Sequence, residues 1–65
     1  MYGLSLFAEG LELVSLDYPL LRQLSPDLLE AMAEDFKRHF GDIAIAQGYA
    51  TGLCIVASEM REVAS

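Results

Sequence analysis

The sequence is short of the residues that usually stabilise very small proteins. It has one cysteine, Cys54, and one histidine, His39, and it has no tryptophan. A single cysteine excludes a disulfide bond within the chain. One Cys and one His also fall short of the four ligands that a structural zinc site requires. We therefore expect no metal and no cofactor.

Basic residues are scarce too. The 65 residues include four Lys and Arg against ten Asp and Glu, which gives a net charge of −6. Beyond the pair Lys37-Arg38 there is no cluster of basic residues, so the basic patch that nucleic-acid binding requires is lacking. The acids are spread evenly along the chain, which also argues against a protein that imitates DNA.

Long apolar segments are absent as well. No apolar run in the sequence approaches the ~20 residues that cross a membrane, and the opening residues lack the basic region of a secretory leader. A lone cysteine is typical of proteins from reducing compartments. These features predict a cytoplasmic protein that does not insert into membranes.

Apolar residues are what the chain has in abundance. They make up 54% of the sequence, and the length suits a single domain over residues 1–65. A domain this small buries only ~60% of the surface that its unfolded chain exposes. Because disulfides and metals are not expected, assembly should cover the remainder, as a homodimer, in a complex with another protein, or both.

Residues 25–41 carry the clearest helix pattern. Ser25 suits the N-cap, Pro26 the first helical position and Gly41 the position after the last turn. Apolar residues recur at helical spacing along one side, at Leu28, Leu29, Met32, Ala33, Phe36 and Phe40. The segment therefore predicts an amphipathic helix that lies on a core.

The segments on either side of this helix have the pattern of β-hairpins. Residues 2–16 alternate around Glu9-Gly10, a plausible two-residue turn. The second hairpin is predicted from short apolar runs at 42–47 and 53–58, which flank a glycine-containing loop. A short extra helical turn is expected near 18–24. The predicted fold class is α+β, with two β-hairpins flanking the central helix (ββ-α-ββ).

The second predicted hairpin is apolar on both faces. In the register that pairs Gln47 with Gly52, Ile43, Ile45, Cys54 and Val56 share one face, and Ala44, Ala46, Leu53, Ile55 and Ala57 share the other. One helix can cover only one face of such a hairpin. The second face must be covered by other parts of the chain or by a partner, which is the main sequence argument for assembly.

Three residues could carry catalysis, but nothing in the sequence brings them together. Cys54 could be a nucleophile activated by His39 and oriented by Asp35. No catalytic motif surrounds Cys54, however, and a buried inert thiol is far more common. His39 is better explained as a cation near the C-terminus of a helix, where it complements the helix dipole. We therefore predict that the chain is not an enzyme.

Two features suggest a surface for a protein partner. Tyr49 is expected at the exposed tip of the second hairpin, where an aromatic side chain could be a binding hot spot. Acids on the polar face of the central helix fit a solvated exterior, and they could also meet a basic protein surface. The predicted partner-binding residues are Tyr49, Asp27, Glu30 and Glu34.

The predicted function is that of a small acidic, non-enzymatic protein-binding module, such as an inhibitor, a regulator or an adaptor. The alternative is a homo-oligomer with a small-ligand-binding or structural role. In that alternative, an apolar pocket at the subunit interface is lined by Phe36, Phe40, Ile45 and Cys54.

Overall fold

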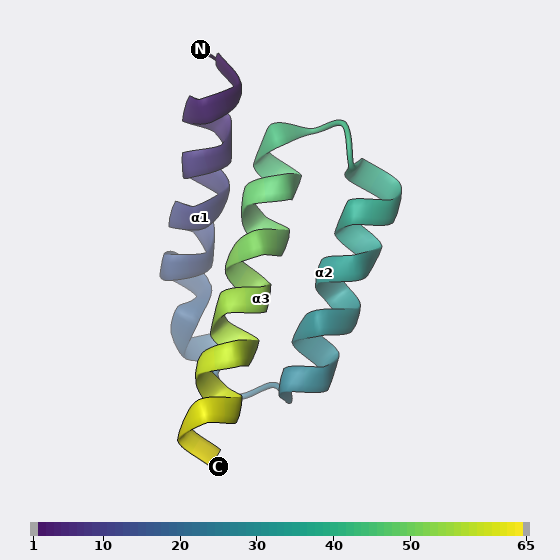
Figure 1. The fold of residues 1–65 in the computed structure, drawn as a ribbon. Coiled ribbons are helices and arrows are strands. Elements are labelled where there is room, and N and C mark those ends of the chain that lie inside the picture. Colours follow the sequence, from purple (N-terminus) through teal and green to yellow (C-terminus); the bar gives the residue numbers. More distant parts are fainter. Residues whose placement is uncertain (1, 65) are drawn as a thin grey trace.

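Residues 2–64 form a bundle of three α-helices (Figure 1). The computed structural model describes residues 2–64, with side chains from Ser5 onward. Helix α1 spans Tyr2–Leu21, α2 spans Pro26–Phe40 and α3 spans Ala44–Ala64. Helices α1 and α3 run in the same direction and α2 runs against them, with α3 between the other two (Figure 1).

The predicted α+β fold is wrong, because residues 2–64 contain no strand. The first predicted hairpin is helix α1, and its supposed turn at Glu9-Gly10 lies inside that helix. The second predicted hairpin is most of α3, including the supposed loop at 48–51. Leu and Glu, which recur in the first segment, and Ala, which recurs in the second, are good helix formers. The glycines that suggested turns serve a different purpose, as contacts between helices.

The predicted central helix is confirmed. Ser25 is the N-cap of α2, with extended backbone angles, and its Oγ accepts a hydrogen bond of 3.1 Å from the backbone N–H of Leu28. Pro26 occupies the first position of the helix, where no N–H is needed. Lys37, Arg38 and His39 lie in the last turn, where positive charge complements the helix dipole.

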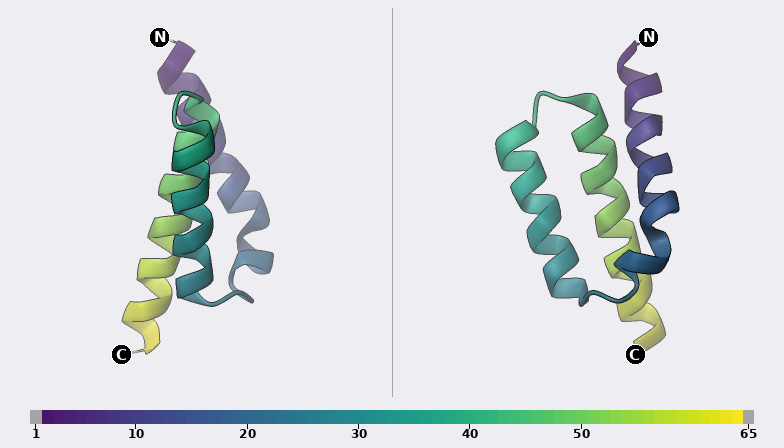
Figure 2. Two further views of the ribbon diagram at one scale, coloured as in Figure 1. Left: turned by 90° about the vertical axis from the view of Figure 1, so that its right-hand side faces the viewer. Right: turned by 180° about the vertical axis from the view of Figure 1, so that it is seen from behind.

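Three glycines bring α1 and α3 unusually close together. A Cβ atom on Gly10 would collide with the backbone oxygen of Ile45, and one on Gly48 would collide with the backbone oxygen of Phe7. A Cβ atom on Gly52 would lie 2.9 Å from the Cβ atom of Val14. Gly48 and Gly52 are four residues apart, so they lie on the same side of α3. The two helices are inclined to each other in the left view of Figure 2.

The core lies along α3. Its buried side chains come from all three helices, and Leu29 and Leu53 are the largest that are completely buried. Both α1 and α2 pack along α3, whereas they hardly contact each other (Figure 1). The bundle is therefore open on the side where a fourth helix would lie in a four-helix bundle.

The connection between α1 and α2 differs from the predicted helical turn at 18–24. Residues 18–21, including Pro19, are the last turn of α1, and hydrogen bonds from Gln23 and Leu24 back to Leu20 and Leu21 tighten its end. Tyr18 ties this end to α3, since its hydroxyl donates a hydrogen bond of 3.3 Å to Glu59.

Candidate functional site

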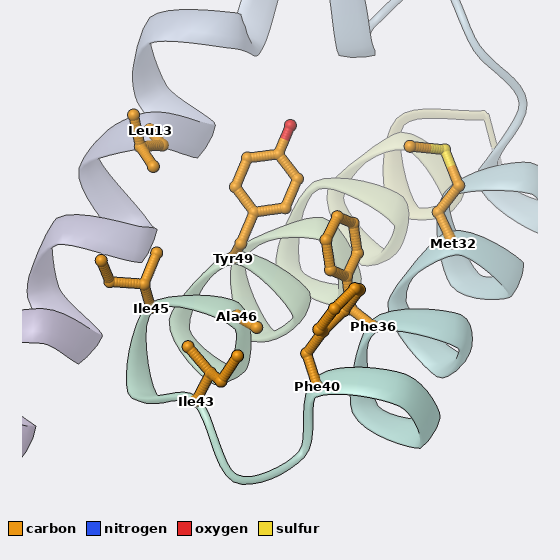
Figure 3. Close-up of a pocket in the computed structure, with 8 residues that line it drawn as sticks. All are labelled: Leu13, Met32, Phe36, Phe40, Ile43, Ile45, Ala46 and Tyr49. Atoms are coloured by element: carbon orange, nitrogen blue, oxygen red, sulfur yellow. The ribbon is translucent and has the colours of Figure 1, made fainter.

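An apolar groove lies between α1 and α2, with α3 as its floor (Figure 3). Its volume is about 490 Å³. Eight described residues line it: Leu13, Met32, Phe36, Phe40, Ile43, Ile45, Ala46 and Tyr49. Of these eight, only Tyr49 carries an oxygen or nitrogen atom in its side chain. The groove is therefore suited to bind apolar groups with few polar contacts.

The walls of the groove are exposed apolar side chains. Phe40 is 48% exposed, Ile43 is 50% exposed and Leu13 is 43% exposed. The apolar arc of α2 is wider than the surface that α3 presents, so Leu29 and Ala33 are buried while Leu28 and Phe40 are not. The sequence pattern of α2 thus supplies both the core contact and one wall of the groove.

Tyr49 forms the polar point in the floor of the groove. Its ring packs on Phe36, with 5.3 Å between the ring centroids, and its hydroxyl donates a hydrogen bond of 3.0 Å to Asp17 on α1. Burial raises the pKa of Tyr49 above its ordinary value of 10.0, and the hydrogen bond to Asp17 and the negative charge of that residue raise this pKa further. Tyr49 therefore links α1 to α2 through α3 and is held neutral.

Because the pKa of Tyr49 is raised in the folded chain, we expect the free energy of unfolding to fall at high pH. A raised pKa in the folded chain means that the contribution of this group is complete below pH 10 and falls as the pH rises above 10. Replacing Tyr49 by phenylalanine should lower the free energy of unfolding by about 1 kcal/mol at pH 7, because one hydrogen bond is lost.

Urea unfolding of both proteins between pH 7 and pH 11.5 measures this effect. The stability of the wild type should decline more steeply above pH 10 than that of Tyr49→Phe, so that the two curves converge. The two proteins share all their other ionisable groups, so the contributions of these groups cancel in the comparison. Parallel curves over this range would show that Tyr49 does not have the raised pKa.

A second cleft lies on the other side of the α2–α3 contact and is different in character. Its volume is about 330 Å³, and Glu30, Glu34, Lys37, Cys54 and Arg61 are among its lining residues. Its charges are largely compensated, because Arg61 forms salt bridges with Asp27, at 2.6 Å, and with Glu30. The hydrogen bond to Glu30, followed by the one to Asp27, raises the pKa of the Arg61 guanidinium.

The predicted partner-binding residues do not share one surface. Tyr49 lies in the apolar groove, half-buried within α3, rather than at an exposed loop tip. Glu30 and Glu34 lie at the second cleft, and Asp27 is engaged with Arg61 on that side. The acidic face of α2 therefore has cations of its own chain beside it.

The residues considered for catalysis are also apart. Cys54 is a free thiol at the second cleft, whereas His39 lines a hollow beside the groove with Asp35, Met32, Phe36 and Phe40. Among the described residues, no group of three or more His, Cys, Asp or Glu is placed to hold a metal ion.

The apolar pocket of the alternative hypothesis is only partly reproduced. Phe36, Phe40 and Ile45 line the groove together, but Cys54 does not. Sequence reasoning missed Leu13 and Ile43 because both were assigned to strands. One signal for Leu13 was available, since Leu6, Leu13, Leu16 and Leu20 recur at a helical repeat.

Comparisons of this chain with protein families, with curated proteins and with solved structures find no match. In the described part of the chain, no helix has the length and apolar character needed to span a membrane.

Proposed function

We propose that this chain is a non-enzymatic protein-binding module, of the inhibitor, regulator or adaptor type, and that it binds its partner in the groove between α1 and α2. The observation that carries the proposal is the groove itself, an apolar surface left open between two helices that hardly touch. Large apolar patches on a small protein usually mark an interaction site.

The chemistry of the groove supports binding rather than catalysis. The Tyr49 hydroxyl is the only hydrogen-bonding side-chain donor among the residues that line the groove, and it already donates its proton to Asp17. Rigid aromatic side chains such as Phe36 and Tyr49, which pack on each other, are typical of interface hot spots. We place this activity in the cytoplasm, because the single cysteine is a free thiol.

Two isoleucines provide a matched test of the groove. Ile43 lines the groove and is 50% exposed, whereas Ile55 lies in a crevice between α1 and α3 and is 51% exposed. Replacing either by glutamine removes a similar amount of apolar surface. If the partner covers the groove, Ile43→Gln should weaken binding about tenfold, since burying the rest of such a side chain contributes roughly 1.5 kcal/mol.

Affinity capture from a lysate with the three proteins measures this difference. Proteins that are captured by the wild type and by Ile55→Gln, but lost with Ile43→Gln, support the proposal. Equal capture by all three proteins, or loss with Ile55→Gln alone, would overturn it. Thermal unfolding of each variant confirms that the fold is kept.

A second candidate function is a homo-oligomer that binds a small apolar ligand. It is favoured by the volume of the groove, which lies within the ~300–1,000 Å³ of typical ligand sites. Thermal shift with a panel of metabolites discriminates between the two. Stabilisation of the purified chain by a small molecule, with no groove-dependent capture of a protein, would favour this second candidate.

A further inference from the structure

The two walls of the groove carry helical stripes that face the place of a missing helix. On α1, the exposed leucines Leu6, Leu13, Leu16 and Leu20 follow spacings of seven, three and four residues. This is the a/d spacing of a coiled-coil seam, and Leu13 shows that the stripe borders the groove. Such a stripe is typical of a helix that packs against another helix.

A matching stripe borders the groove on α2. Met32, Phe36 and Phe40 follow one another at spacings of four residues and line the groove, and Asp35 and His39 line the hollow beside it. A helix laid between the two stripes would rest on Tyr49 and Ile45 of α3. Helix α2 has 15 residues and is therefore about 22 Å long, so a partner helix of three heptads, about 30 Å long, would run along the whole of this wall.

Acidic residues interrupt or border both stripes. Glu9 lies on the leucine stripe of α1, because it falls between Leu6 and Leu13 at the vacant d position, and it is exposed. Asp35 lies beside the α2 stripe and lines the hollow next to the groove. Asp17, on α1, accepts the hydrogen bond from the Tyr49 hydroxyl.

The basic side chains of the chain lie elsewhere. Lys37 and Arg61 line the second cleft, and Arg22 donates a hydrogen bond to Tyr18, which lines the crevice between α1 and α3. Arg38 follows Leu29 by nine residues, which places it on the opposite side of α2 from the core. The groove therefore combines an apolar floor with an acidic border.

From this combination we propose that the groove binds one amphipathic α-helix of a partner protein, and that lysines or arginines flank the apolar stripe of that helix. The inference rests on the proposed function, since it specifies the partner of the same groove. A helix in a groove is a common mode of peptide recognition, read through apolar anchors at helical spacing. A second copy of this chain is a poorer occupant, because each copy has a net charge of −6 and an acidic groove border.

A pair of designed peptides tests the charge of the partner. Both have about 21 residues with leucine at the a and d positions, and they differ only in carrying lysine or glutamate at the e and g positions. Fluorescence anisotropy with the full chain should give at least tenfold tighter binding of the lysine peptide at low salt. The difference should shrink as salt is added, because exposed charges are screened.

Variants of the chain locate the binding site. Ile43→Gln should weaken binding of the lysine peptide about tenfold, and Ile55→Gln should leave it unchanged. Exchanging the border acids in the double variant Glu9→Gln/Asp35→Asn should reduce the preference for the lysine peptide by several-fold without lowering the melting temperature.

Four results would overturn the inference: binding of neither peptide, equal affinity for both peptides, equal effects of Ile43→Gln and Ile55→Gln, or sedimentation of the free chain as a dimer that Ile43→Gln dissociates. Failure of the inference is distinct from failure of the proposed function. If neither peptide binds while capture from the lysate still depends on Ile43, the partner is a protein of another shape and only the inference is wrong.

Discussion

Replacing Gly48 by alanine is expected to push α1 away from α3 and to lower the free energy of unfolding by about 2 kcal/mol. Alanine favours a helix over glycine by up to ~1 kcal/mol, so the substitution would stabilise an isolated helix. In this chain the new methyl group would collide with the backbone oxygen of Phe7. Overpacking costs about 1–3 kcal/mol, and a backbone atom cannot rotate away, so the cost lies at the upper end of this range.

Gly52 provides the control for this prediction. It lies one turn further along α3, but its added Cβ would meet the side chain of Val14, with the Cγ2 atom at 2.5 Å. Replacing Val14 by alanine removes two of the three closest contacts. The cost of Gly52→Ala should therefore fall by about 1 kcal/mol in a Val14→Ala background, whereas the cost of Gly48→Ala should not change.

Urea unfolding of the wild type, the three single variants and the two double variants gives six free energies of unfolding, from which the four costs are obtained. A Gly48→Ala variant that is as stable as the wild type would show that α1 and α3 are not in backbone contact. In that case α1 would lie elsewhere, and the groove wall that it forms would be placed differently.

Replacing Leu53 by alanine is expected to have an effect of similar or larger size. Leu53 is completely buried on α3, in the core cluster to which both α1 and α2 contribute. Such truncations cost about 2–5 kcal/mol through lost burial and the cavity that remains. In a domain of this size each kcal/mol corresponds to roughly 4–8 °C, so the melting temperature should fall by at least about 8 °C.

Ile55 is the matched control for Leu53. It lies two residues further along the same helix, has a side chain of the same composition and is half-exposed. Replacing Ile55 by alanine should cost about 1 kcal/mol or less, and thermal unfolding monitored by circular dichroism measures both variants. Equal losses for the two variants would contradict the placement of Leu53 beneath both neighbouring helices.

Helix α2 could be predicted because local chemistry decides it. Ser25 and Pro26 define its start, the basic last turn marks its end, and its apolar residues form one arc. These signals act within the segment itself and do not depend on the rest of the chain.

Helices α1 and α3 could not be predicted in the same way, because their glycines have a tertiary role. In a sequence, Gly10 and the pair Gly48 and Gly52 are indistinguishable from turn residues. In the folded chain they lie in helices and allow two backbones to approach. Both segments are also apolar on more than one face, which matches a buried strand as well as a central helix.

For the groove too, the sequence predicts only those residues whose placement depends on local helix structure. Phe36 and Phe40 were expected on an apolar surface because the helix pattern of α2 places them there. Tyr49 was expected to be prominent, but it lies in the groove floor only because α3 is a continuous helix. Leu13 and Ile43 come from segments that were predicted as strands, so their place in the walls could not be derived.

The isoleucine side chains give the most direct test of the groove as the binding surface. The chain contains three isoleucines, of which Ile43 and Ile45 line the groove and Ile55 lies in the crevice between α1 and α3. Selective labelling of their δ1-methyl groups yields three NMR signals that can be followed as the lysine-flanked peptide is added. We predict that the signals of Ile43 and Ile45 shift while that of Ile55 stays in place. A shift of the Ile55 signal alone, or three signals that do not move at saturating peptide, would contradict a binding site between α1 and α2.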